Sequence, residues 1–369
     1  MFLKSYPGGG ARPSPRRALR EVRLAEQRAD TISRTLELLR VAATLDQARA
    51  FLKERGVPYS APSWPEMIAK RFWPAITDGA VSPADLVHFL GAVEEQGDQH
   101  VFLFKCSPTA AAKLLDRSRV ERELAQRGAV VVLTQPRVLD LPQAATIVDA
   151  RWEGAGSQTA FILKFTETRT RTVFVREVQE GDTISREYKR EQVRAVNLFK
   201  LYAIGLLEMR IKSHRNSTLY GADVTRMWTL AGSILPSRQF SDYPVTNAKN
   251  ALYRDRHKLP WVRFVDSTFR DDYGISVTAA TGKPITDDAE PTKSLYDSPG
   301  AESALSEFVG HGGHPDNTNV WIVPEPGGGL PSQAIHVLFT SDLNEIVITT
   351  QCTREDYGYV LGRLTALNV

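Results

Sequence analysis

The chain has 369 residues, of which 42% are hydrophobic and 24% charged, with a net charge of +3; this composition excludes a disordered or fibrous chain and suits two or three folded domains. Its apolar runs are shorter than the roughly 18 to 20 residues of a bilayer span, and its start lacks the apolar core of a secretory signal, so we expect a cytoplasmic protein without a membrane partner. Two cysteines, Cys106 and Cys352, are too few for a disulfide framework or a thiolate metal site.

The first hundred residues are predicted to be helical after a flexible start. Residues 1–18 are rich in Gly, Pro and Arg, which predicts a disordered basic arm. A helical domain over 19–100 should contain helices at 19–39 and 44–55. A third helix should start at a cap formed by Ser60 or Ser63 and stop near Trp73, because Pro74 disfavours helical geometry before it. Ser82 and Asp85 have capping-box spacing, so another helix should begin there and lead into a strand at 100–105.

A central α+β domain with a basic surface is predicted over 101–270. Periodicity favours a helix at 109–127 and a strand at 129–133. Strands at 159–165 and 170–178 should form a hairpin around a polar turn at 167–169. A long helix at 187–212 has more apolar positions than one stripe requires, so we expect it to pack on two sides. A shorter helix at 223–235 and a strand at 261–264 complete the domain.

The rest of the chain is predicted to be an acidic, loop-rich connector at 271–317 and a C-terminal sheet-helix unit at 318–369. The unit should contain strands at 320–323, 335–339 and 346–350, and a helix at 355–367. Thr353 and Asp356 form a capping box for that helix. The predicted fold class is therefore α+β, with a helical N-terminal domain followed by mixed antiparallel sheet-plus-helix domains.

The charge is unevenly distributed along the chain. Residues 1–71 carry +7 and residues 186–258 carry +8, so the remainder carries −12. Two basic regions favour a nucleic-acid partner, DNA more than RNA, although the same cations could form solvated faces and internal ion pairs. The candidate nucleic-acid-binding residues are Arg169, Arg171, Lys189, Arg190, Arg194, Arg210, Lys212, Arg215, Arg254, Arg256 and Lys258.

Two segments resemble the centromere protein N (CENP-N) family. Residues 79–86, which lead into the run at 99–104, are similar to the end of that family's helical N-terminal domain, and residues 161–165 with 172–175 are similar to its central region. Members of that family bind nucleosomes and DNA through basic surfaces and are not enzymes, so the resemblance implies a DNA-contacting scaffold. The Arg-rich start, the glycines at 327–329 and the bacterial character of the Ala- and Arg-rich composition depart from the family and argue against a nucleosome as partner.

Two motifs could indicate an enzyme. His311 and His314, with Asp316 nearby, are metal-capable but lie in a Gly/Pro loop without further donors. Glu187 and Lys189 match the Glu-x-Lys core of metal-dependent nucleases, yet that core should lie on a strand and here is predicted to open a helix. We therefore predict no catalytic residue, metal or cofactor.

The expected function is a non-enzymatic protein that binds the DNA backbone as a subunit or adaptor, associated with the nucleoid of a bacterium. Two alternatives stay open. The first is a protein–protein interaction subunit of a bacterial defence or chromosome-handling complex, and the second is a metal-dependent nuclease.

Overall fold

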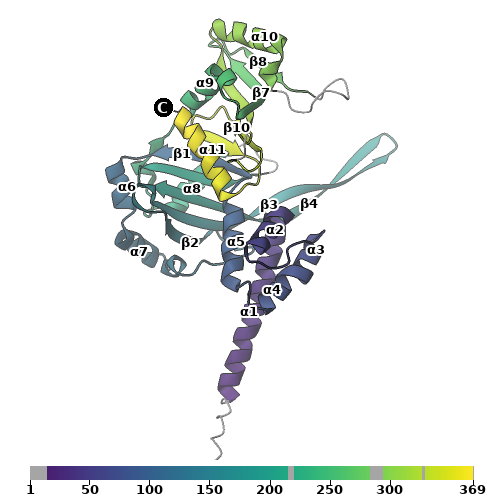
Figure 1. The fold of residues 1–369 in the computed structure, drawn as a ribbon, viewed down its shortest axis with the longest axis vertical. Helices are drawn as coiled ribbons and strands as arrows, with labels where there is room; N and C mark the ends of the chain where they lie inside the picture. Colours follow the sequence, from purple (N-terminus) through teal and green to yellow (C-terminus); the bar gives the residue numbers. More distant parts are fainter. Residues whose placement is uncertain (1–14, 215–219, 283–293, 326–328, 369) are drawn as a thin grey trace, which may run out of the picture. The chain divides into compact units, whose positions relative to one another are not determined.

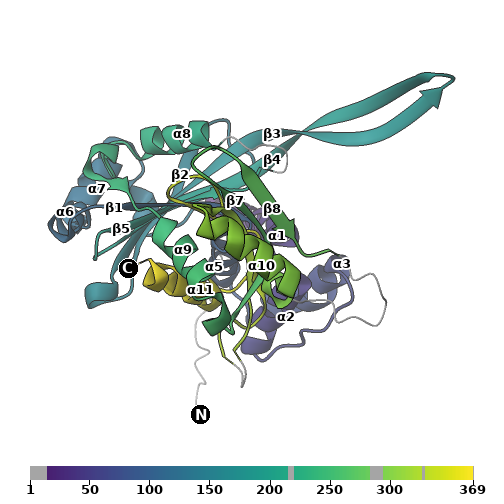
Figure 2. The same ribbon diagram turned by 90° about the horizontal axis from the view of Figure 1, so that it is seen from above.

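The computed structural model describes residues 15–214, 220–282, 294–325 and 329–368, and its fold class is α+β, as predicted. The chain divides into two compact units, residues 1–90 and 91–369. Figures 1 and 2 show the elements of both.

The first unit is helical. It contains α1 (Pro15–Ala42), α2 (Leu45–Glu54), α3 (Trp64–Met67), the π-helical turn η1 (Ile68–Phe72), α4 (Trp73–Thr77) and the start of α5 (Pro83–Glu95). Thr44 caps α2 in a capping box with Gln47, and Ser82 and Asp85 exchange the predicted cap contacts. The ring of Phe51 stacks on Phe89 with centroids 4.3 Å apart, which fixes α2 against α5.

Two details of the first unit differ from the prediction. Residues 15–18 belong to α1, so only residues 1–14 of the predicted disordered arm remain, and these lie outside the described residues. The third helix was expected to stop near Trp73, but the helical path continues through η1 into α4. Pro74 is tolerated there because it occupies the first turn of α4, next to the π-helical turn, where a missing N–H costs little.

The second unit contains one 11-stranded sheet with the order β2-β3-β4-β5-β1-β11-β10-β9-β7-β8, and β6 pairs with β1. Neighbouring strands are antiparallel. The strands are β1 (Gln99–Lys105), β2 (Thr146–Glu153), β3 (Ala160–Glu180), β4 (Thr183–Tyr202), β5 (Leu206–Lys212), β6 (Ser241–Asp242), β7 (Val262–Arg270), β8 (Ser276–Ala280), β9 (His314–Ile322), β10 (Ile335–Phe339) and β11 (Glu345–Ile348).

This continuous sheet replaces the predicted division into a central domain, a connector and a C-terminal unit. β1 pairs with β5 on one side and with β11 on the other, so strands from both sides of the predicted connector share one ladder. The segment 271–317 is also more regular than expected, because its described residues contain β8, α10 (Pro299–Gly310) and the start of β9.

Helices cover the two faces of the sheet at different places and enclose two cores. One core lies under α6 (Pro108–Leu114), α7 (Arg117–Gln126) and α8 (Gly221–Ala231), and the other under α9 (Thr246–Arg254), α10 and α11 (Arg354–Leu367). β1 serves both, since Phe102 and Phe104 belong to the first core and Val101 and Leu103 to the second. Short 3₁₀ turns connect the elements: η2 (Val130–Leu133), η3 (Gly156–Gln158), η4 (Ser237–Gln239), η5 (Arg256–Lys258) and η6 (Leu295–Asp297).

The largest correction concerns residues 159–212. The predicted turn at 167–169 lies inside β3, and the chain turns instead at Gly181, which adopts a φ of +60°. The predicted helix at 187–212 is mostly β4 and β5. At the base of β4, apolar residues face both sides of the sheet. Apolar and polar residues therefore do not alternate there as they do in a half-exposed strand, and the pattern was interpreted as a helix packed on two sides.

Smaller predictions in the second unit had mixed outcomes. The predicted strand at 129–133 is the turn η2, and the predicted helix at 109–127 is split into α6 and α7, because Asp116 caps a new helix start. The strands of the C-terminal segment are confirmed, and so is α11 with the Thr353–Asp356 capping box.

Candidate functional site

The predicted basic residues are largely paired with carboxylates. Four of them, Arg169, Arg194, Arg210 and Arg256, have side chains exposed by 12% or less, and their partners are Glu167, Glu94, Glu208 and Glu302. Arg169 also donates to the Lys212 carbonyl at 2.6 Å. These four cations hold the fold together and do not present a charged surface.

The remaining predicted residues are more exposed but lie in separate places. Arg171, Lys189 and Arg190 lie on β3 and β4, whereas Arg254 and Lys258 lie at the end of α9 and in η5, beside the other core (Figure 1). Glu191 pairs with Arg171 and Lys189, Asp255 with Arg254 and Lys258, and Asp98 with Lys212. Arg215 lies outside the described residues. The described members of the set therefore do not gather on one surface.

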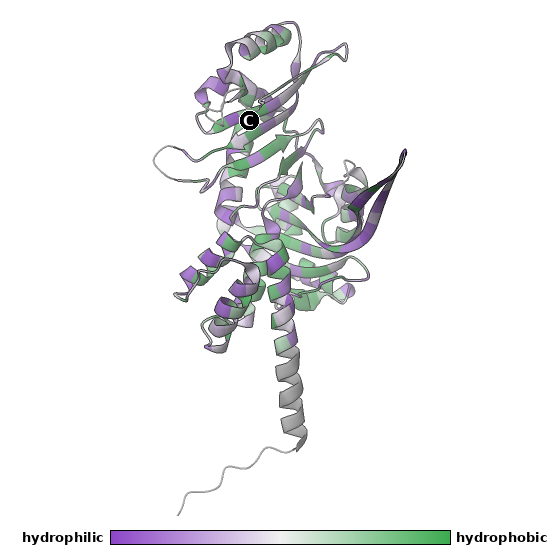
Figure 3. Cartoon of the chain, turned by 90° about the vertical axis from the view of Figure 1, so that its right-hand side faces the viewer, coloured by the Kyte–Doolittle hydropathy of each residue, from purple (hydrophilic) through white to green (hydrophobic). Residues whose placement is uncertain are grey.

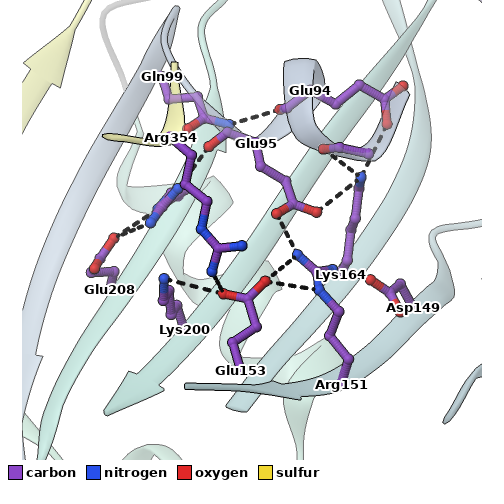
Figure 4. A network of polar contacts seen from close by, with 12 residues as sticks. Glu94, Glu95, Gln99, Asp149, Arg151, Glu153, Lys164, Lys200, Glu208 and Arg354 are labelled. Atoms are coloured by element: carbon purple, nitrogen blue, oxygen red, sulfur yellow. Dashed lines mark hydrogen bonds and ion pairs between the residues drawn. The ribbon is translucent and has the colours of Figure 1, made fainter. Parts of the chain in front are cut away.

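A buried network of charges covers one face of β2, β3, β4 and β5 (Figure 4). Asp149, Arg151 and Glu153 lie on the same face of β2 because strand side chains alternate. Glu95, at the end of α5, accepts hydrogen bonds from Arg151 at 2.6 Å and from Lys164 of β3 at 3.2 Å. Lys164 also pairs with Glu94 at 3.1 Å. The network therefore joins the last residues of α5, which belong to the second unit, to the sheet.

The second half of the network centres on Glu208 of β5, which is fully buried. Its carboxylate accepts hydrogen bonds from Arg210 at 2.7 Å, from Tyr357 of α11 at 2.9 Å and from Tyr202. The guanidinium of Arg210 also lies over the Tyr357 ring, 3.8 Å from its centroid. Glu208 and Arg210 therefore link the sheet to the last helix.

Burial and pairing set the pKa values in this network. Burial alone would raise the pKa of Glu95, but Lys164 and Arg151 outweigh it and lower that pKa to about 2. Burial raises the pKa of Asp149 in spite of Arg151, and it also lowers the pKa of Lys200. Glu95 is therefore a fixed anion at neutral pH whose partners are other side chains of the network. This arrangement is typical of a structural ion-pair network.

The β3–β4 hairpin is much longer than the sheet that supports it. β2 pairs only with residues 160–166 of β3, and β5 pairs only with residues 198–201 of β4. Beyond these points the two strands pair with each other alone and extend away from the sheet (Figure 2). We call residues 170–192, from the Thr170–Gln192 pair to the turn and back, the β arm.

The charges of the β arm neutralise one another. The arm contains five Lys or Arg and five Asp or Glu. Across the two strands, Arg176 pairs with Glu187 at 2.6 Å and Arg186 with Glu177 at 2.7 Å. The hydrogen bond from Arg171 lowers the pKa of Glu191. This purple, hydrophilic ribbon in Figure 3 therefore has no net charge.

Large apolar side chains are exposed between these charges. Phe174 and Tyr188 are exposed by 52% and 55%, and their rings form an edge-to-face pair across the strands with centroids 5.8 Å apart. The other exposed apolar residues of the arm are Val175, Val178 and Ile184. Exposed aromatic and branched side chains on a projecting ribbon are typical of a protein-binding element.

The β arm was missed in the sequence, although one signal pointed to it. Gly181 and Asp182 form a turn dipeptide between two stretches rich in β-branched and aromatic residues, which is a hairpin signature. The buried network had a weaker signal, the alternating charges Asp149, Arg151 and Glu153. Their partners in α5 are distant in the sequence, so the pattern alone did not reveal them.

The two enzyme motifs gain no support from their surroundings. The His311 ring lies 2.8 Å from the Glu307 carbonyl of its own helix end, and Asp316 pairs with Arg270 at 3.3 Å. Among the described residues, no group of three or more His, Cys, Asp or Glu could hold a metal ion. Glu187 and Lys189 lie on a strand, contrary to the predicted helix, but Glu187 pairs with Arg176 on the open arm.

Comparison with known proteins adds no identification. No protein-family profile matches this chain, and no curated protein sequence is significantly similar to it. The resemblance to the centromere protein N family therefore stays a prediction. Within the part of the chain that the structure describes, no helix has the length and apolar character to cross a bilayer.

Proposed function

We propose that this chain is a non-enzymatic interaction subunit that binds a partner protein through its β arm. The observation that carries the proposal is the exposure of five large apolar side chains on a projecting two-stranded ribbon. An isolated two-stranded ribbon is only marginally stable in water, and burying one such side chain contributes about 1.5 to 3 kcal/mol. A partner that covers the arm would therefore gain binding energy and also order the arm.

The charge pattern of the arm favours a protein over a polyanion. Its cations and carboxylates are equal in number and largely paired across the strands, so the arm exerts little net field on a phosphate backbone. Aromatic side chains surrounded by polar groups are the usual composition of a protein interface core and its rim.

Site-specific photo-crosslinking in an extract of the source organism tests this proposal. A photoreactive residue replaces Tyr188 in one variant and Tyr273, which is 90% exposed and lies outside the arm, in the other. We expect a discrete protein adduct from position 188 that disappears when Phe174→Asp is added. Equal adducts from both positions, or adducts insensitive to Phe174→Asp, would overturn the proposal.

Binding to a nucleic-acid backbone is the second candidate function, and one observation favours it. Arg190 is exposed and has no ion pair among the described residues, and Lys189 beside it is 69% exposed in its side chain. Under this candidate the affinity for duplex DNA falls with salt, by a slope near −0.9 per neutralised phosphate on a log–log plot, and Arg190→Glu weakens binding. A flat salt response, or equal binding by Arg190→Glu, would contradict it.

A further inference from the structure

The two edges of the β arm differ in how well they can accept another strand. Outside residues 160–166 and 198–201, no third strand pairs with β3 or β4 in the described chain. The edge of β3 is interrupted by a bulge between Phe174 and Arg176, whereas β4 keeps a regular register along the arm. Neither strand contains proline in the arm. Bulges, prolines and charged side chains all protect an edge from pairing; β4 lacks the first two in the arm, so its backbone is the more regular edge for another strand, and its charged side chains decide which strand fits.

The sequence of β4 restricts which strand can pair there. When two copies of one edge pair antiparallel, their twofold axis is perpendicular to the sheet, and one residue faces itself across that axis. Residues 186–191 read Arg, Glu, Tyr, Lys, Arg and Glu. Tyr188 is the only uncharged residue of the six, so an axis at any of the other five would place a charge against its own copy.

We propose that the β arm pairs with the β arm of a second copy of this chain, β4 against β4, with Tyr188 on the twofold axis. This inference rests on the proposed function and names the partner. The pairing sets Glu187 opposite Lys189 of the second copy, and the symmetry repeats this attractive contact. Both side chains are more than half exposed and so are available for it.

The same register builds a continuous apolar row. Phe174 is the cross-strand neighbour of Tyr188 within each arm. Pairing of the two copies aligns Phe174, Tyr188, Tyr188 of the second copy and Phe174 of the second copy across a four-stranded ribbon. A like-charge contact also arises between Arg186 and Arg190 of the second copy, and the symmetry repeats it, but Arg186 keeps its ion pair with Glu177. A four-stranded ribbon also satisfies the main-chain groups of the β4 edge, which two strands leave open.

Charge exchange at positions 187 and 189 tests this register in the purified full-length chain. We expect sedimentation to show a dimer. Its dissociation constant should be at least about tenfold larger in Glu187→Lys, because lysines then face each other twice. Lys189→Glu should weaken it similarly, and the double variant Glu187→Lys/Lys189→Glu should restore the original dissociation constant. Arg254→Glu, which changes an exposed charge outside the arm, serves as the matched control and should leave the dimer unchanged.

A covalent trap gives a second readout. Tyr188→Cys places two thiols opposite each other at a distance that a disulfide can span, so mild oxidation should yield a covalent dimer. Tyr273→Cys, which lies outside the arm and is more open to solvent than position 188, should not. Because the native Cys106 is partly accessible, both variants are made in a Cys106→Ser background.

The outcomes separate this inference from the proposed function. A chain that stays monomeric at its highest soluble concentration, or a dimer that the double variant fails to restore, overturns the pairing of two arms. If the arm then still crosslinks to a different protein through position 188, the proposed function stands without it. A chain that is monomeric and whose arm crosslinks to nothing overturns both.

Discussion

The buried network and the β arm contain the same kinds of residues but use them differently. In the network, Arg210 and Glu208 are withdrawn from water and each has more than one partner. On the arm, Arg176 and Glu187 form a similar ion pair with both side chains more than half exposed. Solvent screening makes the second pair nearly neutral for stability, whereas removal of one partner from the first leaves an unpaired buried charge. Charge count alone therefore says little about function, and burial separates structural charges from available ones.

Removal of Arg210 should produce the largest effect. We expect Arg210→Met to lower the free energy of unfolding by about 3 to 5 kcal/mol, because Glu208 is left charged and fully buried. Urea unfolding measures this. The double variant Arg210→Met/Glu208→Gln removes the orphaned charge and should recover much of the loss. A single variant as stable as the parent chain would show that the Glu208–Arg210 ion pair does not stabilise the fold.

Acid should weaken the network by protonating Glu95. The resulting loss in the free energy of unfolding should be comparable to or smaller than that of Arg210→Met. The pKa of Glu95 falls from 4.5 to about 2 on folding, so its stabilising contribution is complete above pH 4.5 and is lost as the pH falls toward 2. The shift corresponds to about 3 kcal/mol, and the raised pKa of Asp149 opposes it, because protonation of Asp149 favours the folded state.

Urea unfolding at several pH values between 5 and 3 measures this dependence. Glu95→Gln, which cannot titrate, should flatten the loss of stability in that range. An unchanged pH slope in Glu95→Gln would mean that Glu95 does not carry the effect.

Removal of the aromatic pair of the arm should have a smaller effect on stability, and the effect should be confined to the arm. Phe174→Ala and Tyr188→Ala should each increase local opening, with a coupling energy of about 0.5 to 1 kcal/mol in the double variant. Hydrogen exchange of the arm amides in the free chain measures it, while the exchange of β1 serves as the internal control. Equal acceleration in β1 would show that the arm is not an independent element.

Removal of the exposed Arg176–Glu187 ion pair should have the smallest effect on stability. Arg176→Ala should change the free energy of unfolding by no more than about 0.5 kcal/mol, because both partners are largely solvated. A loss comparable to that of Arg210→Met would remove the distinction between the two regions.

Local signals predicted elements well where a cap or a glycine fixed an end. Ser82 with Asp85 and Thr353 with Asp356 form the predicted caps, because these contacts are made within four residues and need no tertiary partner. The α+β class followed from such elements. Local signals failed for the β arm. Residues 186–194 are rich in Lys, Arg and Glu, which favour helix, and only pairing with β3 makes them a strand.

The candidate site was harder to predict than the fold. Glu167 and Arg169 were predicted to lie in a turn because both are charged, yet Glu167 is buried and bonds to Arg169 and to Asn197. Sequence gives the charge of Arg194 and Arg210 but not the carboxylates that neutralise them, which come from other elements. A surface of free cations therefore cannot be inferred from a basic segment unless the positions in the fold of the carboxylates that pair with it are known.

The position of β1 also determines the order in which strands of the second unit can pair during synthesis. Its partners lie far along the chain, with His100 opposite Ile211 on one side and opposite Val347 on the other. During synthesis β1 must wait for β5 and then, much longer, for β11, so one of its edges stays open until nearly the whole chain has been made. The final strand thus completes the centre of the sheet and not its border, and a nascent chain that stalls before residue 345 leaves one edge of β1 open and lacks the residues that β11 and α11 contribute to the core under α9, α10 and α11.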